Sequence, residues 1–231
     1  MSDSVSAEIA RIQAPAQLIQ ASLTEFARVL PPGISREMFG QWALNMLAKA
    51  LASPDKRQLE SWQRVLDPAN GAGLTSVIVA LKECAELGLR PGSEYYLVPF
   101  GSTVQGITGY KGEIRLITNH EPCTVIARLV RANDKYARTG ANIPPKHDYD
   151  EFGDRGPVTG GYAYVDYGAG RYSLVCALPE VSPSPDADSF ARHKAKAATS
   201  KLWDEWPEQF RIKTLVHGVR KMVPWSAERK W

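Results

Sequence analysis

The chain is 231 residues long, 44% of them apolar and 23% charged, and carries a formal net charge of +3 at pH 7. This composition excludes a disordered or collagen-like chain and is typical of a globular protein large enough to bury its own core. The sequence has no run of 18 apolar residues, no secretory signal and only three widely spaced cysteines, so we expect a cytoplasmic protein with no membrane contact and no disulfide framework.

Helical patterns fill the first third of the chain. Apolar residues at helical spacing predict helices over about 18–30, 36–52, Lys56–Leu66 and Thr75–Leu87. The Gly- and Pro-containing stretch 67–73 is interpreted as a flexible connector, and Gly88 as a left-handed C-cap.

In the middle of the chain apolar and polar residues alternate, which predicts β-strands. Gly101-Ser102 predicts a tight hairpin between two flanking strands, because glycine in the first central position suits such a turn. A short amphipathic segment then contains Ile114, Leu116 and Ile117, and 140–161 reads as a long Pro-, Gly- and Asp-rich loop. The predicted strands are Tyr95–Phe100, Thr103–Thr108, Thr124–Arg131, Tyr136–Thr139, Tyr162–Asp166 and Arg171–Ala177.

Two basic helices are predicted at the carboxyl-terminal end, over about Phe190–Lys201 and Pro207–Val223, after a Pro- and Ser-rich linker. Helices, then antiparallel hairpins, then helices predict an α+β fold rather than a parallel βαβ sheet. We therefore divide the chain into a helical amino-terminal arm over 1–70 that makes oligomer contacts, an α+β core over 71–224 and a short tail over 225–231.

Positive charge is concentrated in the last 42 residues, which contain ten Lys and Arg against four Asp and Glu, whereas the first 189 residues carry a net charge of −3. In the final predicted helix, five apolar residues fall within about 100° of arc and predict a buried face. Lys213, His217, Arg220 and Lys221 lie away from it on a cationic edge. This edge predicts either a phosphate-binding surface or a solvated helix face.

The loop 147–154 is the one candidate for metal chemistry. It contains His147 and four carboxylates that suit a hard cation such as Mg²⁺, so a metal-dependent nuclease is an alternative function. The loop lacks the spacing of a rigid helix or strand, and a solvated acidic loop is the simpler interpretation. The sequence has no P-loop, HExxH, GxSxG or GxGxxG motif.

Three motifs in order carry a family resemblance: Gly88-Leu89-Arg90-Pro91-Gly92, Tyr96-Leu97-Val98-Pro99-Phe100-Gly101 and Gly109-Tyr110-Lys111-Gly112. They resemble the signature of the RecT family of phage single-strand annealing proteins, which are related to the beta protein of the lambda-type Red system. Later matches extend the resemblance over about residues 40–224, and include Asn133-Asp134, His147, Gly161-Tyr162-Ala163, Lys213-Thr214 and Pro224.

The resemblance implies an ATP-independent annealing protein, not an enzyme, that pairs single-stranded DNA with a complementary strand in homologous recombination. It implies a homo-oligomer, either a ring or a helical filament, which holds single-stranded DNA and the annealed duplex in a cationic groove. A phage exonuclease is the implied partner and the bacterial cytoplasm the implied location. No catalytic residue and no cofactor is required, and a role for Mg²⁺ stays open.

The DNA contacts that the resemblance suggests are Tyr110, Lys111, Arg131, Lys196, Lys201, Lys213, His217, Arg220 and Lys221. Aromatic residues next to cations, as at Tyr110-Lys111, are typical of single-strand binding, although aromatics are also common in cores. Two departures from the family pattern weaken parts of this prediction. His217-Gly218 stands where a basic pair is frequent, and only seven residues follow Pro224, which weakens the expectation of tail contacts with a host single-strand binding protein.

Two rival functions make different predictions. A nuclease would cleave the strands in the presence of divalent ions, whereas an annealing protein leaves them intact. A structural protein whose basic helices bind an acidic partner would show no length-dependent binding to oligonucleotides.

Overall fold

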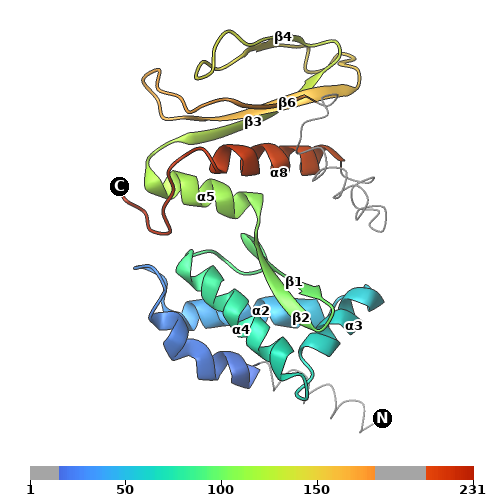
Figure 1. Cartoon of the computed structure of the whole chain (residues 1–231), viewed down its shortest axis with the longest axis vertical. Helices are drawn as coiled ribbons and strands as arrows, with labels where there is room; N and C mark the ends of the chain where they lie inside the picture. The colour runs from blue at the N-terminus through green and yellow to red at the C-terminus, as the bar shows by residue number, and fades with distance from the viewer. Residues whose placement is uncertain (1–15, 180–206) are drawn as a thin grey trace. The chain divides into compact units, whose positions relative to one another are not determined.

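The computed structural model describes residues 16–179 and 207–231, and the fold is α+β as predicted (Figure 1). The predicted helix over Phe190–Lys201 lies outside these residues. The chain forms two compact units: the first comprises the residues through Leu116 together with Ser226–Lys230, and the second comprises Ile117–Trp225 with Trp231. No helix within the described ranges is long and apolar enough to span a bilayer.

Side-chain caps set the starts of the helices in the first unit. Ser35, Asp55 and Asn70 each accept a hydrogen bond from a backbone N–H in the first turn of the helix that follows. The cap at Asn70 starts its helix at Gly71, so the predicted flexible connector over 67–73 is wrong in its last part. After a helix over 16–27, the helices are α2 (Arg36–Leu51), α3 (Lys56–Val65) and α4 (Gly71–Glu86).

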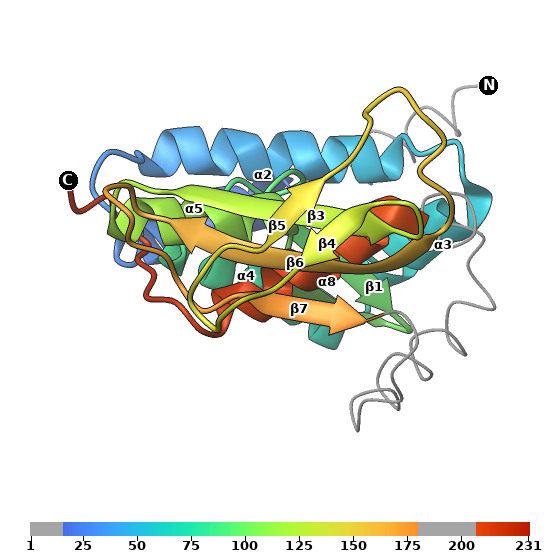
Figure 2. The same cartoon turned by 90° about the horizontal axis from the view of Figure 1, so that it is seen from above.

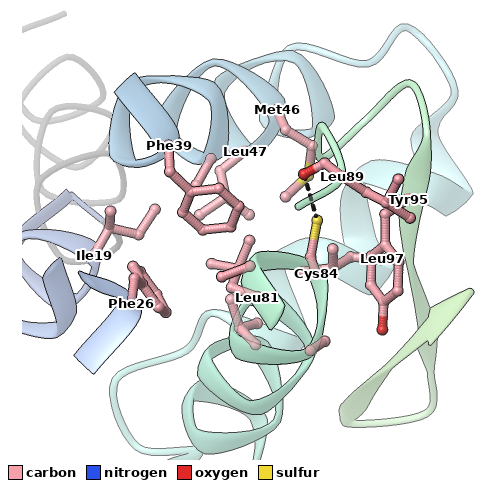
Figure 3. Close-up of a cluster of buried hydrophobic side chains, with 14 of the residues drawn as sticks. Ile19, Phe26, Phe39, Met46, Leu47, Leu81, Cys84, Leu89, Tyr95 and Leu97 are labelled. Atoms are coloured by element: carbon pink, nitrogen blue, oxygen red, sulfur yellow. Dashed lines mark hydrogen bonds between the residues drawn. The ribbon is translucent and has the colours of Figure 1, made fainter. Parts of the chain in front are cut away.

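One apolar core holds the first unit together (Figure 3). The rings of Phe26 and Phe39 meet edge to face at 5.3 Å, between the helix over 16–27 and α2. Cys84 of α4 donates a hydrogen bond to the carbonyl of Leu89, inside the same core. The helices before residue 70 thus share their core with α4 and with the strand that follows it.

A hairpin follows the helices of the first unit. Strand β1 (Tyr95–Phe100) pairs antiparallel with β2 (Thr103–Thr108), as predicted. Gly101 has φ 62° at the turn and Gly88 has φ 63° after α4, so both predicted left-handed glycines are confirmed. The amphipathic segment after the hairpin forms α5 (Tyr110–His120).

The first and third signature motifs meet around Glu94. Its carboxylate accepts hydrogen bonds from the backbone N–H of Arg90 and from the Arg115 guanidinium, both at 2.8 Å. Its carbonyl accepts the N–H of Gly109 at 2.8 Å. A Cβ on Gly112 would lie 2.4 Å from that same carbonyl oxygen. These motifs therefore build the junction at which α5 begins.

The second unit is built on a three-stranded antiparallel sheet with the order β3-β6-β7. Its strands are β3 (Thr124–Arg131), β6 (Val158–Asp166) and β7 (Cys176–Pro179), and a separate hairpin joins β4 (Lys135–Ala137) to β5 (Lys146–Asp148). Two predictions are corrected here. β5 and the start of β6 lie inside the stretch predicted as a loop over 140–161, and the last strand lies later than predicted, with Tyr172 making only an isolated bridge to Asp166.

Helix α8 (Pro207–Arg220) covers one face of this sheet, and the β4–β5 hairpin lies over the other (Figures 1 and 2). Leu215 and Val219 of α8 are buried against Ala163 and Val165 of β6. Small residues allow the close approach: a Cβ on Gly161 would lie 2.7 Å from Leu215 Cδ1, and one on Gly218 would lie 2.7 Å from Cys176 Sγ. The predicted apolar face of the last helix is confirmed.

We predict that Gly112→Ala destabilises the protein by roughly 1 kcal/mol or more. Overpacking against the Glu94 carbonyl costs about 1–3 kcal/mol, which exceeds the gain of about 1 kcal/mol from alanine in a helix. The measurement is urea denaturation followed by circular dichroism. Gly71→Ala is the matched control, because a Cβ there meets no heavy atom within 4 Å. Equal stability of the two variants would contradict the prediction.

Candidate nucleic-acid interface

Two lysines and a histidine form a row on the solvent side of α8 and at its end. Lys213 and His217 are exposed on the helix, four residues apart, and Lys221 is exposed in the turn that follows Arg220. Four residues advance a helix by about 6 Å, so Lys213 and His217 lie on one face. The apolar residues of α8 occupy the arc that faces the sheet, and the row therefore faces away from the core.

Arg220 stands at the edge of this row and contacts an aromatic ring. Its guanidinium carbon lies 4.1 Å from the centre of the Trp225 ring, a cation–π contact. Trp225 itself is 44% exposed. Sequence reasoning placed Arg220 among the DNA contacts and missed Trp225, because nothing in the local pattern shows that the chain turns back toward the helix after Pro224.

Arg131 is held in a structural position. Its guanidinium forms an ion pair with Glu208 in the first turn of α8 and donates a hydrogen bond of 3.1 Å to the Gly156 carbonyl. Its backbone N–H donates to Asp134 at 2.7 Å. Arg131 thus links β3 to α8 and is not part of the exposed row, although the resemblance groups it with those residues.

An aromatic cluster covers the sheet face opposite α8. Tyr162 and Tyr164 project from β6 with rings stacked at 6.2 Å and an interplanar angle of 8°. Tyr136 of β4 contacts Tyr162 at 5.7 Å, and His147 of β5 contacts it at 5.6 Å. Burial raises the pKa of Tyr162 to about 12, so its hydroxyl stays protonated. The cluster fastens the β4–β5 hairpin to the sheet.

A buried carboxylate lies beneath the hairpin. The Asp134 side chain has no exposed surface, and it pairs with Arg155 at 2.8 Å and with Nε2 of His147 at 2.9 Å. The hydrogen bonds from Arg155, more than those from His147 and the Arg131 backbone, hold the pKa of Asp134 well below its usual range. Nδ1 of His147 lies 3.2 Å from the Tyr162 hydroxyl, so both ring nitrogens are engaged.

The loop 147–154 has the geometry of a set of turns. Asp150 accepts the backbone N–H of Phe152 at 3.0 Å, and Asp154 accepts that of Gly156 at 2.9 Å. Over the described ranges, no three His, Cys, Asp or Glu side chains converge to hold a metal ion. The ring of Phe152, 98% exposed, stands out from the loop.

Two predicted contacts, Tyr110 and Lys111, lie in the first unit. Tyr110 is 37% exposed and Lys111 is exposed, in the first turn of α5 beyond the Glu94 junction. A Cβ on Gly109 would lie 2.5 Å from the ring of Tyr96, which is itself 43% exposed. The structure thus brings Lys213, His217, Arg220 and Lys221 together, places Tyr110 and Lys111 as a pair elsewhere, and leaves Lys196 and Lys201 outside the described residues.

Comparison with known proteins gives two matches. The model of the RecT family matches residues 52–230. The protein called "Protein RecT" from Escherichia coli (strain K12) is 30% identical over 166 residues, which cover 66% of this chain and 59% of the relative. The chain therefore spans less than two thirds of the length of this relative.

We predict that Asp134→Asn lowers the free energy of unfolding by roughly 3 kcal/mol at pH 7, because it breaks a buried ion pair and leaves Arg155 uncompensated. A lowered pKa in the folded state stabilises the fold above the pKa of the unfolded carboxyl, about 3.9, and this stabilisation is lost as the pH falls below it. Urea titrations of the wild-type protein and of Asp134→Asn at pH 7 and pH 3 measure the difference in their free energies of unfolding. This difference should be smaller at pH 3. Asp148→Asn, on the exposed side of β5, is the control. A difference that stays constant with pH would contradict this account.

Proposed function

The chain belongs to the RecT family, and from this premise we propose that it binds single-stranded DNA and pairs it with a complementary strand, without ATP, during homologous recombination. The observation that carries the proposal is the exposed row formed by Lys213 and His217 on α8 and Lys221 just after it, while the other face of the helix is fixed against a sheet. The two lysines offer point charges to a phosphate backbone at positions that the core holds in place.

Binding through the backbone suits annealing. Lysine contacts to phosphates carry no sequence information, so base pairing with the incoming strand supplies the specificity. The pairing edges of the bases remain available while the phosphates are held. The second strand is captured when its pairing and stacking outweigh the displacement of the first strand from the protein, a step that needs no covalent chemistry and no catalytic residue.

Tyr110 and Lys111 are proposed as a second contact with the strand. An exposed tyrosine beside an exposed lysine combines a stacking surface with a phosphate partner. The Glu94 junction supports this role, because it fixes the turn from which both side chains project. Lys196 and Lys201 stay proposed contacts on the strength of the family resemblance.

The proposal includes a homo-oligomer, a ring or a helical filament, whose neighbouring subunits join their cationic rows into one groove. The helical arm over 1–70 is proposed to make the contacts between subunits. A phage exonuclease that exposes the single strand and the bacterial cytoplasm complete the proposal, and both rest on the family alone. The proposal requires no cofactor, and the effect of Mg²⁺ is a variable of the test.

We predict that Lys213→Ala with Lys221→Ala slows annealing of complementary oligonucleotides and weakens binding to oligothymidylate. Each lost phosphate contact lowers the slope of log K against log salt by about 0.7 for single strands, so the double variant should lose roughly 1.4. Fluorescence anisotropy across a salt series gives the slope, and a strand-pairing assay with EDTA and without ATP gives the rate.

The matched control is Lys135→Ala with Lys146→Ala, which removes two exposed lysines from the β4–β5 hairpin. It should leave the salt slope unchanged. An unchanged slope in the Lys213/Lys221 variant would refute the assignment of this row to DNA. Cleaved strands in the presence of Mg²⁺ would instead favour the nuclease, and no length-dependent binding would favour a structural protein.

A further inference from the structure

Trp225 occupies a defined position at the end of α8. The helix closes with a hydrogen bond of 3.0 Å from Met222 N–H to the Val219 carbonyl, and Val223 is buried in the core of the second unit. Pro224 restricts the backbone immediately before the tryptophan. Trp225 is thus exposed on a segment that is anchored to the core two residues earlier.

Arg220 covers part of the Trp225 ring, and much of the residue remains accessible. The Arg220 guanidinium lies over the ring at 4.1 Å, yet the residue keeps 44% of its surface exposed. A partly exposed indole held next to a guanidinium can offer a stacking surface to a flat ligand.

The surroundings favour a nucleobase as that ligand. Lys221 follows Arg220 directly and ends the cationic row, so a strand whose phosphates follow the row would bring a base to the platform. Arginine stacked on the far side of the indole would complete a sandwich of guanidinium, indole and base. Aromatic stacking accepts any base, which suits a protein that does not read sequence.

We propose that Trp225 is a stacking platform for one nucleobase of the bound single strand, and that Arg220 is its positioning residue rather than a phosphate contact. This inference rests on the proposed function. It adds a base contact, just after the last helix, to the proposed phosphate contacts. It also gives different roles to Arg220 and Lys221, which are neighbours in the sequence.

The test compares a normal strand with a strand that has no bases. Oligothymidylate and an abasic phosphodiester of equal length are titrated against the wild-type protein and three variants, Trp225→Ala, Trp225→Phe and Lys221→Ala. We expect Trp225→Ala to weaken oligothymidylate binding about tenfold and to leave abasic binding unchanged. Trp225→Phe should restore most of the affinity, and Lys221→Ala should weaken binding to both strands. Trp231→Ala, which removes another exposed tryptophan, is the matched control and should have no effect.

A second measurement, tryptophan fluorescence, reports stacking on Trp225 directly and does not depend on a change in affinity. The difference between wild-type and Trp225→Ala emission reports one of the six tryptophans, and we expect oligothymidylate, but not the abasic strand, to quench it. Equal weakening of both strands by Trp225→Ala, failure of phenylalanine to restore binding, or no quenching would overturn the platform while leaving DNA binding intact. A wild-type protein that binds neither strand would overturn the proposed function itself.

Discussion

The contact between α8 and the sheet determines what the second unit presents to solvent. Gly161 and Gly218 leave no room for a side chain between helix and strands, so α8 lies close to β6 and β7 and its rotation about its own axis is fixed. The Arg131–Glu208 ion pair fixes its first turn to β3. Because the apolar side of α8 packs against the sheet, the opposite side of the helix faces solvent. The packing of α8 on the sheet therefore directs Lys213 and His217 toward solvent.

Charged groups in this protein fall into two kinds that composition cannot separate. Arg131 and Arg155 form ion pairs with carboxylates within the fold. Glu94 likewise accepts hydrogen bonds from Arg90 and Arg115. Lys213 is exposed on α8, and Lys221 is exposed in the turn that follows it. A lysine on a flexible stem suits a mobile polyanion, whereas the planar guanidinium suits fixed geometry.

The sequence predicted most of the fold, because local signals coincide with tertiary ones. The apolar period of α8 and the glycine turn at Gly101 both appear where expected. The strand β5 was missed because it is only three residues long and depends on the contact of His147 with Asp134, a residue separated from it by 13 positions. The role of Arg131 was missed for the same reason, since its partner Glu208 lies 77 positions away. The family motifs are evident in the sequence, whereas the contacts of Glu94 with Arg90 and Gly109 require the folded structure.

The cysteines of this chain have a practical consequence. Burial raises the pKa of the Cys84 thiol and of the Cys176 thiol, and burial together with the Glu121 charge does the same for Cys123. Little reactive thiolate is therefore present at neutral pH, and alkylating reagents attack these positions slowly. A cysteine introduced on an exposed surface, such as the Gly101-Ser102 turn, would react first. Replacing Cys176 to avoid labelling would disturb the packing of α8, because its sulfur fills the space beside Gly218.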